Sequence, residues 1–400
     1  MKIRLPRRFC AVISGLVFYL AGFFKLMDPT GAGLVVDSYL SFFHLGFLSP
    51  ISSVIAEALA FAEAFTGLAL VTGVYRRIAA KAAFILTGLF TLVTLVLVVA
   101  NPEMDCGCFG EVVHLSHLQT FIKNLILAAL LCTAFLPLRN VPSGPSSKPL
   151  FIFAGVVVLA IGVYSLVFLP IRDYTSFAPG ERLYDIAKTS SSVPQEPLFV
   201  YEKDGFRKEF DLENLPDSTW TFVDTHERPA FTDASAEAIV AVSNASGEVC
   251  DSVLLEGGVI AFCVHSPEKQ SISRWRNISR GIADASAAGF RPALLVAGSA
   301  DMMEEILEPL PSEEKIPLLL SMYFADRKTL ITLVRSNGGA VYLSDGLVID
   351  KWSGVNLPSA RHYEALAGKP PVKAMMDATI PGRITLWAVL LLTVLPVLFI

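Results

Sequence analysis

The sequence predicts a helical membrane bundle and a soluble α/β domain held between two further membrane spans. Apolar residues make up 53% of the 400 residues and charged residues only 17%, where a soluble domain carries about 25% charged residues. The mean hydropathy is +0.55. Apolar stretches of membrane-spanning length fill the first part of the chain, whereas strand and helix patterns alternate later.

The charge balance gives no sign of nucleic-acid binding. The formal net charge is -5, and no run of five or more like charges occurs in the chain. Nucleic-acid-binding domains usually carry a basic patch or stripe that neutralises phosphates. We therefore exclude nucleic acid as a partner and take the lipid bilayer as the first partner.

Six apolar windows approach the roughly 20 residues that a helix needs to cross a bilayer. They cover residues 9–27, 51–74, 79–100, 118–136, 150–169 and 384–400. A basic segment precedes the first window, as in a signal peptide, but Phe23, Phe24 and Lys25 stand where the small residues of a cleavage site belong. We expect a retained anchor there, and loops at 28–50 and 101–117.

The basic residues predict how the chain is oriented. They flank the second and fourth connections, as Arg76, Arg77, Lys81, Arg139 and Lys148. The connections 28–50 and 101–117 contain no Lys or Arg. Because basic loops stay in the cytoplasm, we expect a cytoplasmic N-terminus and a periplasmic soluble segment at 171–383, in a bacterial inner (plasma) membrane. That side is oxidising.

The composition also divides the chain into units. Residues 141–149 (VPSGPSSKP) have the Pro, Gly and Ser content of a flexible joint. We predict a four-helix membrane domain at 1–137, a cytoplasmic linker at 138–149, a fifth transmembrane helix at 150–170, a stalk or added region at 171–240, a soluble domain at 241–370 and a sixth transmembrane helix at 384–400. The stalk region includes a strand-like stretch at 198–203, but no role can be assigned to it.

Three ionisable residues lie within the first two spans. Lys25 is near the outer end of the first span, and Glu57 and Glu63 are in the second. Such residues are costly in hydrocarbon and usually face a bundle interior. One interpretation is a structural polar pair that fixes helix packing. The other is a proton-handling site, in which depth in the membrane favours Glu57 as the partner of Lys25.

The loop before the fourth span has the densest chemistry of the chain. It reads DCGCFG over 105–110, so Cys106 and Cys108 are separated by one glycine, which accepts unusual backbone angles. A disulfide closing so small a ring would be strained and easily reduced. We therefore favour a redox pair, with an inert structural disulfide as the alternative.

The same loop allows a metal site. Cys106, Cys108, His114 and His117 are ligands suited to zinc or copper. The CxC spacing is less diagnostic of a metal than CxxC, and histidines also occur at membrane interfaces. Metal binding therefore stays a third alternative.

Three motifs in this part of the chain resemble the DoxX/MauE superfamily. The stretch 14–39 (SGLVFYLAGFFKLMDPTGAGLVVDSY) resembles its first helix and loop, and 63–70 (EAFTGLAL) its acidic second-helix motif. The run 106–110 (CGCFG), followed by 121–124 (FIKN), resembles the MauE-type cysteine loop and fourth helix. The resemblance covers roughly residues 8–137.

The resemblance implies a role in thiol chemistry. MauE proteins are implied to assist maturation of the disulfide-rich subunit of methylamine dehydrogenase, and DoxX relatives are tied to thiol or quinone redox. The family motif favours Glu63 over Glu57 as the functional acid. No cofactor is established by the sequence, although a quinone in the bundle would suit this resemblance.

The soluble domain resembles a thioredoxin-like fold in the order of its predicted elements. Strands are expected at 258–265 and 291–297, helices at 271–289, 300–310, 327–336 and 357–366, and a hairpin over 340–352. The hairpin would turn at Asp345-Gly346, a favoured two-residue turn.

This domain departs from a redox-active thioredoxin where chemistry would occur. Residues 266–270 read SPEKQ in place of a CxxC, and 337–339 read NGG where that family keeps a cis-proline. Cys263 lies within the first strand and is expected in the core. A bridge between Cys250 and Cys263 is a weaker expectation. We do not expect enzymatic activity from this domain.

Three functions remain. In the first, Cys106 and Cys108 exchange with a periplasmic client or thiol-redox partner, or pass electrons to a quinone, while Glu63 and Lys25 handle protons. In the second, the chain is a non-catalytic accessory that anchors and binds a client protein. In the third, the Cys/His loop handles a metal.

Overall fold

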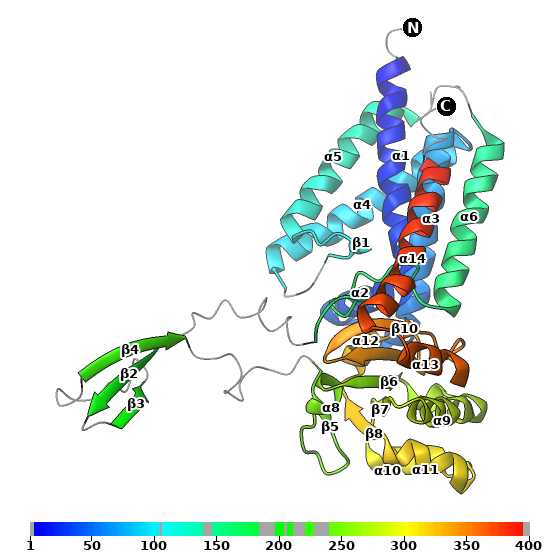
Figure 1. Cartoon of the computed structure of the whole chain (residues 1–400). Helices are drawn as coiled ribbons and strands as arrows, with labels where there is room; N and C mark the ends of the chain where they lie inside the picture. The colour runs from blue at the N-terminus through cyan, green and yellow to red at the C-terminus, as the bar shows by residue number, and fades with distance from the viewer. Residues whose placement is uncertain are drawn as a thin grey trace.

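The structure, a computed structural model, describes residues 4–102, 104, 106–138, 146–183, 197–203, 206–210, 221–227 and 240–394. Asp105 of the cysteine loop, most of the predicted linker and most of the predicted stalk therefore lie outside the described residues. Long helices pack side by side in one half of the molecule, and a mixed sheet with its own helices forms the other half (Figure 1). The membrane-type and soluble parts predicted from composition are thus distinct in space.

Among the described residues, five helices have the length and apolar composition to cross a membrane. These five are α1 (Arg4–Met27), α3 (Ser52–Thr72), α4 (Arg76–Ala100), α5 (His117–Phe135) and α6 (Lys148–Val167). These helices confirm the first five predicted windows. We call the end where α1 ends and α3 begins the domain end of the bundle, because the soluble domain lies there (Figure 1).

Small residues let α1 and α3 approach closely. A Cβ added to Gly22 would lie 2.4 Å from the backbone nitrogen of Ala64, and one added to Gly67 would lie 2.3 Å from the backbone nitrogen of Tyr19. Membrane helices associate through such small-residue contacts, since burial from water gives them no driving force. The α1–α3 pair therefore forms the tight centre of the bundle.

The predicted loop at 28–50 is mostly helical, so that prediction is wrong for its first half. Helix α2 (Pro29–Phe42) follows α1 directly, and the short 3-10 helix η1 (Gly46–Ile51) leads into α3. Asp28 caps α2 by accepting a hydrogen bond from the backbone nitrogen of Gly31, and Pro29 occupies the first turn. Asp-Pro is a helix-start signal, but α2 is too short to span a bilayer.

The last described helix, α14 (Pro371–Val394), begins well before the sixth predicted span. Leu386 is 3% exposed and packs with Leu26, Ala64 and Val158 of α1, α3 and α6. The helix is not among the five candidate spans of the described residues. Residues 395–400 lie outside the described residues, so the sixth span stays a prediction.

The soluble domain is built on a six-stranded sheet with the order β10-β9-β6-β7-β8-β5. Strands β6 (Gly258–Val264), β7 (Arg291–Val296) and β8 (Met322–Ala325) are parallel, while β9 (Gly339–Ser344), β10 (Leu347–Trp352) and β5 (Val242–Ser243) join antiparallel. The predicted hairpin turns at Asp345 and Gly346, whose φ angles are 48° and 72°. Both central residues of that turn type need positive φ.

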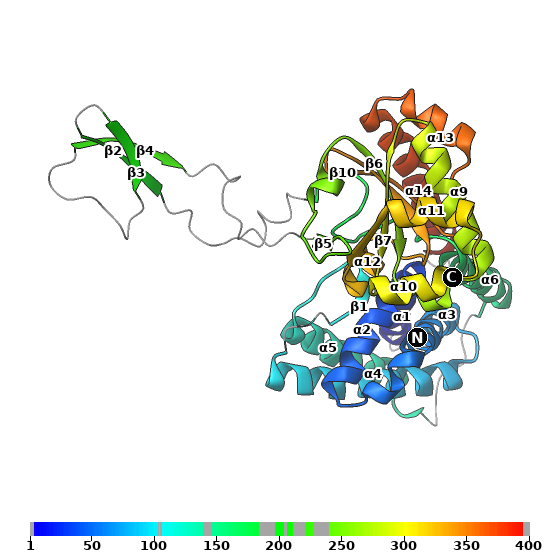
Figure 2. The same cartoon turned by 90° about the horizontal axis from the view of Figure 1, so that it is seen from below.

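Helices cover both faces of this sheet. Helices α9 (Ile272–Ala287), α10 (Ala300–Leu307), α11 (Ser312–Leu320) and α13 (Ala360–Ala367) enclose one core, and α8 (Ser252–Leu255) and α12 (Arg327–Leu333) the other. Figure 2 shows α9, α11 and α13 together on one side of the strands. The sequence missed α11, β5 and β8, which are short and carry weak patterns.

The cysteines of this domain do not bridge. Cys263 is fully buried in the core, as predicted, and burial raises the pKa of its thiol to about 12. Cys250 is a separate thiol whose Sγ donates to the carbonyl of Glu248. The expected Cys250–Cys263 bridge is therefore wrong.

A separate three-stranded sheet lies within the predicted stalk. Its order is β3-β2-β4, so β2 (Pro197–Lys203) lies between β3 (Phe206–Phe210) and β4 (Thr221–Glu227). Both pairings are antiparallel. The strand-like stretch at 198–203 is therefore part of a small added sheet.

Candidate functional site: a thiol-lined cavity in the bundle

An ion pair joins the two central helices of the bundle. The Nζ atom of Lys25 lies 2.7 and 2.8 Å from the two carboxylate oxygens of Glu63. The Glu63 side chain is 2% exposed and that of Lys25 is 15% exposed. The family motif therefore identified the partner of Lys25, and the argument from membrane depth did not.

Glu57 takes no part in this pair. It lies one to two turns closer to the domain end of α3 and is half-buried. Among the described residues it makes no ion pair. The α1 and α3 backbones are in close contact, so the ammonium of Lys25 extends along the helix pair to reach Glu63. Depth alone misled because a lysine stem spans more than a helical turn.

The cysteine loop folds against α2 near the domain end. Cys106 is 5% exposed, and Cys108 begins the short strand β1 (Cys108–Glu111). Gly107 has φ +55°, and a Cβ there would lie 2.4 Å from Cγ1 of Val35. Only glycine combines this conformation with this contact. The hydroxyl of Tyr39 donates to the Cys106 carbonyl at 2.6 Å, so α2 fixes the loop twice.

A histidine lies against the first thiol. The Sγ atom of Cys106 is 2.9 Å from Nδ1 of His117, and Nε2 of His117 is 2.9 Å from the carbonyl oxygen of Pro102. Because a carbonyl only accepts, Nε2 carries the proton, and Nδ1 of a neutral ring is left to accept from the thiol. A capping box at Ser116 and Gln119 fixes the start of α5, where His117 is the first residue.

This arrangement is a nucleophile beside an oriented base. The imidazole can take the proton of Cys106, and the Pro102 carbonyl holds the ring in the required tautomer. The sequence drew attention to His117 only as a metal ligand. Its spacing of eleven residues from Cys106 crosses a loop, so no local pattern predicted the contact.

The thiols and the ion pair line one cavity of about 240 Å³, which we call the thiol cavity. Its walls are mostly apolar and come from α1, α2, α3, α4 and α5. The polar lining groups are Lys25, Tyr39, Glu63, Thr94, Cys106, Cys108, Lys123 and Asn124. An apolar pocket with a few convergent polar groups is the usual form of a small-molecule site. The structure thus places four of the five predicted site residues around one space, and leaves Glu57 outside it.

The four ligands of the predicted metal site do not come together. Among the described residues, no group of three or more His, Cys, Asp and Glu side chains is placed to hold a metal ion. His114 is exposed and, with His117, lines a different cavity that neither cysteine borders. The four predicted ligands therefore do not converge.

An arginine of the soluble domain reaches the cysteine loop. Arg335 follows α12, and its guanidinium lies 2.9 Å from Asp28 and 3.0 Å from Glu111 of β1. Its side chain is only 4% exposed. A second ion pair joins Lys351 of β10 to Asp173 at 2.5 Å. Neither contact could be predicted from a local pattern, because the partners are far apart in the chain.

Residues 4–137 match the family model of methylamine utilisation protein MauE. The helical part is MauE-like. This match covers a third of the chain and includes every residue of the thiol cavity. Residues 196–229 match a domain of unknown function (DUF8463), which coincides with the small three-stranded sheet. No curated protein and no solved structure matches the chain.

Proposed function

We propose that this MauE-like membrane protein carries out thiol–disulfide exchange for the maturation of a client protein, with Cys106 and Cys108 as the exchanging pair. The observation that carries the proposal is the 2.9 Å contact between the Cys106 thiol and His117 at the wall of the thiol cavity. The match to a methylamine utilisation protein supports an accessory role in that process. The client is then a protein with cysteines to pair.

The exchange begins at the more accessible thiol. Cys108 is half-buried and Cys106 is buried, so a client thiolate attacks Cys108 of the oxidised pair. The Cys106–Cys108 bond breaks, a mixed disulfide with Cys108 forms, and Cys106 leaves and is protonated through His117. A second client thiol then displaces Cys108. The client gains one disulfide, and the chain retains two thiols.

Reoxidation of the pair requires a two-electron acceptor, and we assign a quinone-class acceptor to the thiol cavity. The chemistry that such a group supplies when bound is the uptake of two electrons and two protons. The cavity fits a flat ring, since its walls are apolar and Lys123 and Asn124 offer donors. His117 removes the proton of Cys106 as the disulfide forms. Lys25 and Glu63, paired across the cavity wall, hold a proton close to the site.

Quinone-dependent oxidation of the chain's own thiols tests this proposal. The reduced protein in detergent is mixed with a short-chain quinone, and quinone absorbance and free thiols are followed together. We expect one quinone consumed per two thiols lost, with no consumption by Cys106→Ser or Cys108→Ser. Cys132→Ser is the matched control, because Cys132 is an exposed thiol of α5 away from the cavity. Equal consumption by all three variants would contradict the proposal.

His117 is tested separately, because a structural role would give a different result. We expect His117→Asn to slow thiol oxidation by about 10²-fold or more at neutral pH, which is the usual size of a general-base effect. The rate should recover as rising pH ionises Cys106 without help. A variant that is slow at every pH would indicate a misplaced loop instead of a lost base.

We also propose that the soluble domain is thioredoxin-like and non-catalytic, on the periplasmic side of a bacterial inner membrane. The order β10-β9-β6-β7, with β6 and β7 parallel and the hairpin antiparallel, supports the fold. The absence of basic residues from 28–50 supports the orientation. In the full chain, Cys106→Ser/Cys108→Ser should remove all disulfide-reductase activity. Residual activity that Cys263→Ser abolishes would overturn the assignment.

A further inference from the structure

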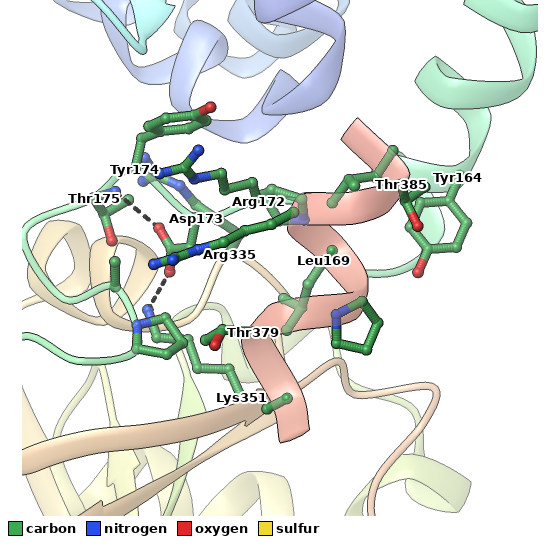
Figure 3. A pocket seen from close by; sticks show the side chains of 18 of the residues that line it. Tyr164, Leu169, Arg172, Asp173, Tyr174, Thr175, Arg335, Lys351, Thr379 and Thr385 are labelled. Atoms are coloured by element: carbon green, nitrogen blue, oxygen red, sulfur yellow. Dashed lines mark hydrogen bonds and ion pairs between the residues drawn. The ribbon is translucent and has the colours of Figure 1, made fainter. Parts of the chain in front are cut away.

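A second, larger cavity lies between the bundle and the soluble domain. It has a volume of about 950 Å³ and is bounded by α6, α14, β10 and the segment 169–181. Figure 3 shows Arg172, Asp173, Arg335 and Lys351 gathered on one side of α14, with Tyr164 of α6 on the other. The cavity therefore has a charged part and a part that adjoins a membrane span.

The walls of this cavity on the side of the bundle are apolar. They are formed by Val157, Ala160 and Ile161 of α6 and by Val389 of α14. Helix α6 is a candidate span, and this wall lies in its last three turns. Gly382 of α14 lies so close to the segment after α6 that an added Cβ would be 2.5 Å from the carbonyl oxygen of Ile171. The cavity thus begins at a membrane surface and extends along two helices.

Two of the cations in the charged part of the cavity are already neutralised by ion pairs. Lys351 pairs with Asp173, and Arg335 pairs with Asp28 and Glu111. Burial would raise the pKa of Asp173, but the Lys351 ammonium and hydrogen bonds from Lys351 and Thr175 hold it below its usual value. Lys351 and Asp173 therefore satisfy each other, and this pair offers no free charge to a ligand.

Two further cations line the cavity, and neither has an ionic partner among the described residues. The Arg172 guanidinium lies 4.8 Å from the ring centre of Tyr174, and Arg383 lines the cavity from α14. Both arginines are close in the chain to the apolar walls. Arg172 comes soon after the end of α6, and Arg383 comes just before the buried Leu386 of α14. The acids Glu181 and Asp350 also line the cavity, and neither makes an ion pair among the residues that the structure describes.

We propose that this cavity binds a membrane phospholipid. Arg172 and Arg383 bind its phosphate, because guanidinium groups pair with phosphate oxygens in bidentate geometry. Its acyl chains lie against Val157, Ile161 and Val389 and continue into the bilayer. A cavity with arginines at the membrane surface and an apolar wall beneath them is complementary to a headgroup with attached chains, and not to a free anion. This site is separate from the thiol cavity and does not depend on the proposed exchange activity.

Lipid binding to the delipidated full-length protein tests the proposal by native mass spectrometry. The probes are phosphatidylglycerol, diacylglycerol of the same chain length, and inorganic phosphate. We expect specific binding of phosphatidylglycerol, at least tenfold weaker binding of diacylglycerol, and no competition from inorganic phosphate. Equal binding of diacylglycerol would overturn the proposal, because the arginines would then not contribute to binding. Equal competition by inorganic phosphate would also overturn it, because the apolar wall would then not contribute.

Charge variants locate the site. We expect Arg172→Gln/Arg383→Gln to weaken phosphatidylglycerol binding at least tenfold, and Arg172→Lys/Arg383→Lys to retain most of it. The matched control is Arg280→Gln/Arg361→Gln, which removes two exposed arginines of the soluble domain. Unchanged binding in the first variant, or an equal loss in the control, would contradict the assignment. The Lys variant keeps the test decisive if the Gln variant is poorly folded.

Discussion

The helical bundle and the soluble domain both contain cysteines, but the two regions surround them differently. In the bundle, Cys106 lies 2.9 Å from His117 and lines a cavity with Cys108. In the soluble domain, Cys263 is fully buried and its pKa is raised to about 12. The residues after β6, where a thioredoxin carries its thiols, are His265 and Ser266. In the bundle a thiol lies beside an imidazole at a cavity wall, whereas the thiol of Cys263 is enclosed by the core of the soluble domain.

The two regions are joined by buried charges, which gives the soluble domain a positioning role. Arg335 bridges the cap of α2 and the last residue of β1, and both elements hold the cysteine loop. Through this contact the soluble domain can affect how Cys106 and Cys108 are presented. Substitutions are therefore expected to have large effects in the bundle and smaller effects in the soluble domain.

The largest effect is expected at the ion pair inside the bundle. Lys25→Met or Glu63→Gln alone should destabilise the bundle by about 3–5 kcal/mol, because each leaves an unpaired buried charge. The double variant should be more stable than either single variant. The measurement is a double-mutant cycle of unfolding in detergent. Glu57→Gln is the control and should add independently to Lys25→Met, and strong coupling there would break the assignment of Glu63.

The next effect is expected at the contact between the two regions. Arg335→Met should cost about 2–3 kcal/mol, the order of one or two hydrogen bonds between charged groups. Alkylation of Cys108 should become faster, since Glu111 no longer holds β1. Arg291→Met, which removes an exposed arginine far from the bundle, is the control. An unchanged alkylation rate in Arg335→Met would show that the domain does not position the thiol loop.

The smallest effect is expected inside the soluble domain, and it depends on pH. Burial raises the pKa of Asp350 to about 6, whereas an unfolded Asp titrates near 3.9. A raised carboxyl pKa means that the folded state binds the proton more tightly, so the stability contributed by this group increases as pH falls from about 6 to about 4.

Asp350→Asn removes the free-energy cost of burying a charged carboxylate at neutral pH. We expect the variant to be about 2 kcal/mol more stable than the parent chain at pH 7.5 and equally stable near pH 4. The side-chain oxygen of Asn can still accept from the backbone nitrogen of Lys351, as Asp350 does at 2.8 Å. Urea unfolding followed by tryptophan fluorescence at both pH values measures the difference. A loss of stability at pH 7.5 would mean that the Asp350 charge has an ionic partner.

Much of the fold could be predicted from local patterns. Long apolar windows identify spans, and the Asp345-Gly346 turn identifies the hairpin, because each depends on neighbouring residues. Helix α2 begins at the start signal Asp28-Pro29, but its 14 residues are too few for the length criterion that identifies spans. The short strands β5 and β8 depend on pairing with distant strands, which no local pattern predicts.

The site could be predicted in its members but not in its contacts. Lys25, Glu63, Cys106 and Cys108 stand out because charges and thiols are rare in a membrane bundle. The partnership of Cys106 with His117 depends on how the loop folds against α2, and the Arg335 contact joins residues more than 200 positions apart. Tertiary packing, which the sequence does not display, decides both.

Thiol trapping of Cys106 and Cys108 in intact membranes tests the central claim most directly. The membranes are equilibrated in a series of thiol–disulfide buffers, and each cysteine is then alkylated and quantified, with Cys132 as the internal reference. We predict that Cys106 and Cys108 are protected together under oxidising conditions, become reactive together as the buffer is made reducing, and that Cys108→Ser leaves Cys106 reactive throughout. If both cysteines stay reactive in the most oxidising buffer, or stay protected under a strong dithiol reductant, the pair is not a redox couple and the account is wrong.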